Sequence, residues 1–172
     1  NAGSITITNT GTLTNNGPFT NDGIIKNDGT LNNYVAITHN GTLINHERFN
    51  NEGTLFNNGN INSDGEIRNN GNIYNDRTFN NDGNIINTGT LTNNGPFTND
   101  GIIKNDGTLN NYVAITHNGT LINHERFNNE GTLFNNGNIN SDGEIRNNGN
   151  IYNDRTFNND GNIINTGVLT NQ

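Results

Sequence analysis

Four histidines are the first residues of this chain to consider for chemistry. They are two sites and their copies, His39 with His117 and His46 with His124. Histidine serves as a general base or a metal ligand because its ordinary pKa lies near neutral pH. His39 and His117, however, stand in a repeat position that elsewhere holds asparagine. We therefore expect His39 to be a structural substitute and His46 to form a surface pair, with no catalytic residue among the four.

Carboxylates directly before glycine form a second candidate site. Asp28, Asp64 and Asp82 offer the oxygen ligands that calcium prefers. Calcium-binding β-rolls use a nine-residue repeat with paired glycines, whereas the repeat of this chain has six residues. Turn-forming aspartate on a solvated corner is the simpler interpretation. We expect no metal or cofactor, and calcium binding is the alternative.

All of these residues belong to a six-residue repeat, Gly-x-Ψ-x-Asn-x, in which Ψ is Ile, Leu or Phe. The repeat is clearest in Gly53–Asn58 and Gly59–Asp64, and counted from Ile5 to Gln172 it runs 28 times without insertion or deletion. Ψ is apolar in all 28 units, and the Asn position holds Asn in 24. The three fixed residues always fall on odd positions. Strict alternation is typical of β-strands with one buried side.

Each unit is therefore expected to be a short strand followed by a corner. Asn-Gly and Asp-Gly steps recur at the joints, as in Asn16-Gly17 and Asp22-Gly23. We expect these residues to take the left-handed backbone conformation of a sharp corner. A meander of hairpins is the alternative. A coil of parallel strands explains the unbroken alternation better, because six is even and the two sides never exchange.

The coil size follows from a resemblance. In Leu31–Ala36 and Leu55–Asn60 an aliphatic and a small residue stand four apart. This spacing resembles the hexapeptide-repeat left-handed β-helix family, in which three units form a triangular coil of 18 residues. The resemblance implies one all-β domain, residues 1–172, built as a parallel β-solenoid of about nine coils. The Gly- and Asn-rich texture is also similar to repeat regions of surface adhesins, whose β-helices are right-handed, so handedness is open and left-handed is favoured.

An 18-residue coil makes specific neighbours. It predicts contact between Arg48 and Glu66 and between Phe56 and Tyr74, and it places His46 between Asp28 and Asp64. At about 4.8 Å between coils, the rod is about 45 Å long.

Inward asparagines need hydrogen-bond partners, because a buried unpaired amide costs on the order of 1–3 kcal/mol. Stacking in successive coils supplies them. The expected structural ladder includes Asn15, Asn33, Asn51, Asn69 and Asn87.

A long internal duplication shapes the surface. Residues 9–89 are identical to 87–167, a period of 78 residues or 13 units, while residues 1–10 form an entry or cap and 168–172 the C-terminal end. Because 13 is not divisible by three, the second copy is turned by one face. No face then keeps its chemistry. This argues against a regular threonine surface for ice binding, although Thr12, Thr30, Thr42, Thr54 and Thr78 share one repeat position.

Composition narrows the class of partner. The net charge of −8 argues against nucleic acid, which needs a basic face. No apolar stretch approaches the roughly 20 residues of a membrane-spanning helix. Cysteine and methionine are both absent, which suits a long-lived extracellular material.

We therefore predict a non-enzymatic structural protein. It would be a rigid rod of a surface adhesin, stalk or self-assembling extracellular fibre, whose partners are further copies of itself and a host or environmental surface. The predicted assembly edge, which would pair with residues 161–172, is Ser4, Ile5, Thr6, Ile7 and Thr8. An ice-binding or carbohydrate-binding solenoid is the alternative. The acyltransferase activity of some hexapeptide proteins needs an extruded loop, which the unbroken repeat does not predict.

Overall fold

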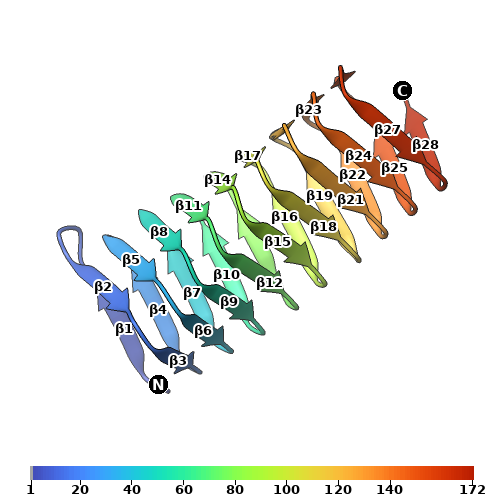
Figure 1. Cartoon of the computed structure of the whole chain (residues 1–172). Helices are drawn as coiled ribbons and strands as arrows, with labels where there is room; N and C mark the ends of the chain where they lie inside the picture. The colour runs from blue at the N-terminus through green and yellow to red at the C-terminus, as the bar shows by residue number, and fades with distance from the viewer. Residues whose placement is uncertain (1) are drawn as a thin grey trace.

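The chain winds into a β-solenoid. A computed structural model describes residues 2–172, which form 28 short β-strands. Each strand pairs in parallel with the strands three positions before and after it, giving about nine coils of about 18 residues (Figure 1). These residues contain no helix that could cross a membrane. The parallel pairing confirms the predicted solenoid and excludes the meander of hairpins.

Three sheets form the sides of the coil. Sheet A contains β1 Ser4–Ile7, β4 Ile24–Asn27, β7 Thr42–Asn45, β10 Asn60–Ser63, β13 Phe79–Asn81, β16 Pro96–Asn99, β19 Ala114–His117, β22 Thr132–Asn135, β25 Asn150–Asn153 and β28 Val168–Asn171. Sheet B contains β2 Thr12–Asn15, β5 Thr30–Asn33, β8 Arg48–Asn51, β11 Glu66–Asn69, β14 Asn84–Asn87, β17 Ile102–Asn105, β20 Thr120–Asn123, β23 Asn138–Ser141 and β26 Phe157–Asn159. Sheet C contains β3 Pro18–Asn21, β6 Ala36–His39, β9 Thr54–Asn57, β12 Asn72–Asn75, β15 Thr90–Asn93, β18 Thr108–Asn111, β21 Arg126–Asn129, β24 Glu144–Asn147 and β27 Asn162–Asn165.

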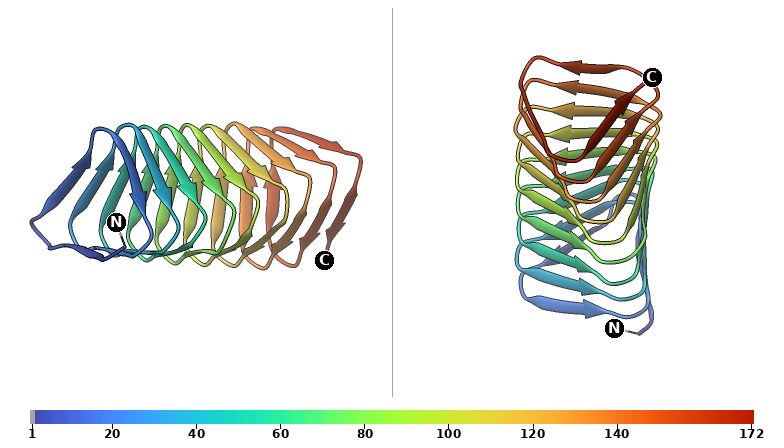
Figure 2. Two further views of the ribbon diagram at one scale, coloured as in Figure 1. Left: turned by 90° about the horizontal axis from the view of Figure 1, so that it is seen from below. Right: turned by 90° about the vertical axis from the view of Figure 1, so that its right-hand side faces the viewer.

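The coils stack as triangles along one axis, with the two termini at opposite ends (Figure 2). From β2 onward, residues 18 apart lie opposite each other, as the coil size predicted. Phe79 lies opposite Phe97, for example, and their rings stack with centroids 4.8 Å apart. The Ψ residues of the interior coils are at most 2% exposed, so one continuous apolar core runs along the axis. Pooling the core between coils lets a chain of low apolar content fold.

The first unit departs from the predicted repeat. Ile5 pairs with Ile25, and Ile7 pairs with Asn27. Ile5 therefore takes the Ψ position, and Ile7 takes the Asn position at 5% exposure. The repeat counted from Ile5 was wrong here, because the first corner, Thr8–Gly11, is two residues longer than the others and closes with a Gly11 N–H bond to the Thr8 carbonyl at 2.7 Å.

Glycine has a different reason at the corners than predicted. None of the described residues has a positive φ, so the left-handed corner was wrong. Space explains the glycines instead. A Cβ on Gly41 would lie 1.8 Å from the carbonyl oxygen of Gly23 one coil earlier, and on Gly59 it would lie 2.1 Å from that of Gly41. Coils approach so closely at these corners that a side chain cannot fit.

Candidate functional site

The main polar feature is a set of three inward amide columns, one behind each sheet. The predicted ladder residues all lie in the sheet B column: Asn15 donates to Asn33, Asn33 to Asn51, Asn51 to Asn69 and Asn69 to Asn87. The Nδ2-to-Oδ1 distances are 2.7–2.8 Å. Apart from Asn15, these residues are 0% exposed. The structure thus contains the asparagine ladder.

Each ladder amide uses both of its hydrogens. Asn69 donates to Oδ1 of Asn87 at 2.7 Å, and also to the carbonyls of Gly71 at 3.1 Å and Thr90 at 2.9 Å. Its own Oδ1 accepts from Asn51. A buried polar group with all partners in place avoids the desolvation penalty that would oppose folding. One side chain therefore ties together two coils and a corner.

The ladder has one direction. Within these columns every Asn amide donates to the following coil, toward the C-terminus, as Asn75 does to Asn93 and Asn93 to Asn111. A second set of amide rows on the outer surface runs the other way. Asn50 donates back to Asn32, and Asn58 donates back to Asn40.

The sequence interpretation missed these outer rows. The available signal was polar Asn recurring at even positions 18 apart.

The four non-Asn positions interrupt the columns. The Oδ1 atoms of Asn57, Asn81, Asn135 and Asn159 are buried without a hydrogen-bond partner. Each lies 18 residues after a His or Ser, namely His39, Ser63, His117 and Ser141. Because donation runs forward, a substitute that does not donate to the next coil leaves that coil's oxygen unpaired.

The two inward histidines are structural, as their Asn position predicted. Nδ1 of His39 lies 3.2 Å from the Asn21 amide, and Nδ1 of His117 lies 3.0 Å from the Asn99 amide. Both Nε2 atoms are buried without a partner. Burial lowers the pKa of His39, opposed by backbone groups of Asn60 and Gly41. Burial also lowers the pKa of His117 to about 4, so both rings are neutral at pH 7.

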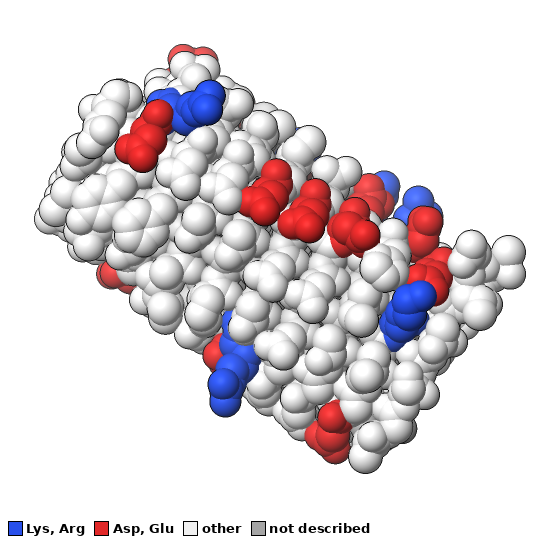
Figure 3. Space-filling model, turned by 180° about the vertical axis from the view of Figure 1, so that it is seen from behind, with Lys and Arg blue, Asp and Glu red and all other residues white. Residues whose placement is uncertain are grey.

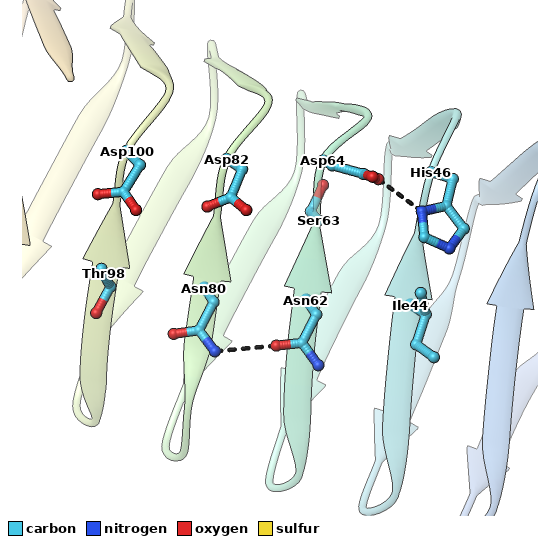
Figure 4. Close-up of a pocket in the computed structure, with 9 residues that line it drawn as sticks. All are labelled: Ile44, His46, Asn62, Ser63, Asp64, Asn80, Asp82, Thr98 and Asp100. Atoms are coloured by element: carbon cyan, nitrogen blue, oxygen red, sulfur yellow. Dashed lines mark hydrogen bonds and ion pairs between the residues drawn. The ribbon is translucent and has the colours of Figure 1, made fainter. Parts of the chain in front are cut away.

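The outward histidines form the predicted surface pair with one aspartate. Nδ1 of His46 lies 2.7 Å from Oδ1 of Asp64 beside a shallow groove of about 410 Å³ (Figure 4). Asp82 and Asp100 continue the row at the same corner of the next two coils (Figure 4). An equivalent groove of about 260 Å³ lies beside His124. Both grooves are open to solvent.

The predicted calcium candidates do not converge. Asp28 is paired with Lys26 at 2.7 Å, and the coil of His46 separates it from Asp64. Residues 2–172 contain no group of three or more His, Asp or Glu side chains placed to hold a metal ion. Acidic groups on the face in Figure 3 lie singly or in a short row, and basic groups are few.

The remaining outward pairs follow the 18-residue register. Arg48 lies 3.6 Å from Glu66, and the rings of Phe56 and Tyr74 stack with centroids 5.3 Å apart. Their copies lie on other faces. The Arg48 pair is in sheet B and its copy in sheet C, while the Phe56 pair is in sheet C and its copy in sheet A. The predicted turn of the second copy by one face is confirmed.

The two coil ends expose residues that are buried elsewhere. Ile163 and Leu169 are 37% and 36% exposed, whereas their first-copy counterparts Ile85 and Leu91 are 0% exposed. The β1 edge predicted from Ser4 to Thr8 is a strand over Ser4–Ile7 and lies at the open edge of sheet A, with Thr8 in the following corner. The predicted cap, residues 1–10, thus contains β1 and most of the long corner, with Asn1 outside the described residues.

Comparison with known proteins found no matching family model, no matching curated protein and no matching solved structure. The chain's own geometry is therefore the basis for its function.

Proposed function

We propose that this protein is a non-enzymatic structural rod that assembles end to end into an extracellular fibre or stalk. The observation that carries the proposal is the inward ladder. It places hydrogen bonds, not a cavity, along the centre of the molecule, and each coil presents the next with the same apolar and amide pattern. Length then grows by adding coils, and the rod itself is the product of the repeat.

The arrangement of the candidate chemical groups supports a non-enzymatic role. His39 is 0% exposed and its ring replaces a ladder amide. His46 faces solvent beside an open groove. A general base needs a positioned substrate within hydrogen-bond reach, and neither histidine has surroundings that would hold one.

Cell-surface or extracellular placement is part of the same proposal. The chain lacks the sulfur-containing residues that oxidise most readily. Its net charge of −8 suits a soluble rod that does not bind nucleic acid. Further copies of the chain are the primary partners.

Ice binding is not supported by the surface. Thr12 and Thr30 lie in sheet B, Thr42 in sheet A and Thr54 in sheet C. A flat ice-binding face would need them side by side on one sheet.

Electron microscopy of the purified chain over a range of concentrations tests the proposal. We expect thin filaments of uniform width whose length increases with concentration. Dispersed rods of about 45 Å at every concentration would refute end-to-end assembly.

A further inference from the structure

We propose that copies assemble head to tail in one rotation, with β1 of the incoming copy on β26 of the preceding copy. This inference rests on the proposed function, since it specifies how the proposed filament is joined. The evidence is the order of the strands, the direction of the ladder and the shape of the first coil.

Strand order fixes the rotation. Successive strands visit sheets A, B and C in turn, and the last strand, β28, is in sheet A. The next position on the spiral is therefore in sheet B, on β26. An incoming copy that starts there places β2 on β27 and β3 on β28. Any other rotation leaves the two ends mismatched along the axis by at least a third of the roughly 4.8 Å coil spacing.

The ladder fixes the polarity. At the C-terminal end, Asn165 lacks the forward amide acceptor that Asn147 has, and donates only to Gly167 among residues 2–172. At the N-terminal end, Asn15 donates forward to Asn33, and no coil precedes it to donate to its Oδ1. Placing β2 on β27 brings the Asn165 donor to the Asn15 acceptor. Joining two like ends would place donors against donors or acceptors against acceptors.

The apolar residues match in the same register. Ile5 stacks on Phe157, Leu13 on Ile163 and Phe19 on Leu169, which continues the three Ψ columns. Burying the exposed Ile163 and Leu169 side chains supplies a hydrophobic driving force.

Gly17 provides a test that separates assembly from folding. A Cβ on Gly17 would meet nothing within 4 Å in the isolated chain. With β3 on β28, Gly17 lies over Gly167 of the preceding copy. At corners inside the rod, such as Gly95, a Cβ would lie 2.3 Å from the carbonyl oxygen of the coil below. Gly17→Ala is therefore expected to leave the monomer folded and to block the joint.

Ile7 limits the joint to two ladder columns. It stands in the Asn position of β1 and would lie over Asn159, offering the Asn159 amide no acceptor. Ile7→Asn would complete the third column and is expected to lower the critical concentration for filaments.

Three double-cysteine variants test the rotation, because the chain has no cysteine of its own. Each carries Thr14→Cys, combined with Ile164→Cys, Thr170→Cys or Asn158→Cys on β27, β28 or β26. Directly paired residues on neighbouring parallel strands lie within the Cα separation that a disulfide bridges. Under mild oxidation, the proposal expects disulfide-linked oligomers for the Ile164 pair and little crosslinking for the other two. Preferential crosslinking of either other pair, or equal crosslinking of all three, would overturn it.

The assembly measurement accompanies the crosslinking. We expect Gly17→Ala to raise the critical concentration at least about tenfold with an unchanged circular dichroism spectrum, a change in free energy of about 1.4 kcal/mol. Filaments that form normally from Gly17→Ala would refute this joint while leaving the fibre function intact. Rods that never form filaments, in the wild type or in any variant, would refute the fibre function itself.

Discussion

Nε2 of His39 and Oδ1 of Asn57, one coil apart in the same column, are both buried without a hydrogen-bond partner. Their copies, His117 and Asn135, repeat the relationship. The chain thus carries the same ladder interruption twice, on two different sheets.

Replacing both inward histidines by asparagine should stabilise the rod. His39→Asn and His117→Asn supply a forward donor to Asn57 and Asn135, and an unpaired buried group costs about 1–3 kcal/mol. The urea midpoint of the double variant should rise. The matched control, His46→Asn with His124→Asn, changes exposed side chains and should shift the midpoint little. A double inward variant less stable than wild type would contradict the ladder account.

Stability should depend on pH through the inward histidines. Their pKa is lowered by burial, for His117 to about 4, while in the unfolded chain it is about 6.5. Between these values the unfolded state binds more protons, so stability is complete above about pH 6.5 and falls as the pH drops toward 4. Asp100 opposes the shift at His117.

Unfolding midpoints measured from pH 7.5 to pH 4 test this dependence. The His39→Asn and His117→Asn double variant should show a flatter curve over that window than the outward double control. Parallel curves for the two variants would show that other groups cause the loss.

An interior ladder residue should matter more than its terminal counterpart. Asn93→Ala leaves the Asn75 donor and the Asn111 acceptor without partners, and each should cost about 1–3 kcal/mol. Asn165→Ala lies in the exposed last coil of the same column, where the chain offers no following coil. Its effect on the urea midpoint should be less than half as large. Equal effects would indicate that ladder position is unimportant.

Gly17 and Gly95 are the same position in the two copies and should respond differently to alanine. A Cβ on Gly95 would lie 2.3 Å from the Arg77 carbonyl oxygen, whereas one on Gly17 would meet nothing within 4 Å. Overpacking of this kind costs roughly 1–3 kcal/mol. Gly95→Ala should lower the urea midpoint under conditions that keep the chain monomeric, and Gly17→Ala should not. Similar losses for both would argue for a backbone requirement rather than a steric one.

The sequence was sufficient for the repeated part of the fold. Alternation set the inward side, and pairs such as Arg48 with Glu66 supported the coil size. The first unit was ambiguous because Ile5 and Ile7 are both apolar and two apart, so either could fill the Ψ position. The structure resolves this with a longer corner, which no composition signal marks.

The direction of the ladder was also beyond the sequence. Asparagine is both donor and acceptor, so its spacing predicts a column but not which way the amides point. Only with the direction known do Ser63 and His39 mark the following oxygens, Asn81 and Asn57, as unpaired. The corner glycines were found correctly, but negative φ values show that close packing between coils, not backbone handedness, requires them.

Helical reconstruction of wild-type filaments by electron microscopy tests the central claim most directly. Twenty-eight strands in three sheets predict a rise of about 45 Å per copy, with strands about 4.8 Å apart continuing across each joint. Each copy should be turned by about one face relative to its neighbour, apart from any twist of the solenoid itself. Filaments built from rods packed side by side, or with copies related by any other rotation, would contradict the account.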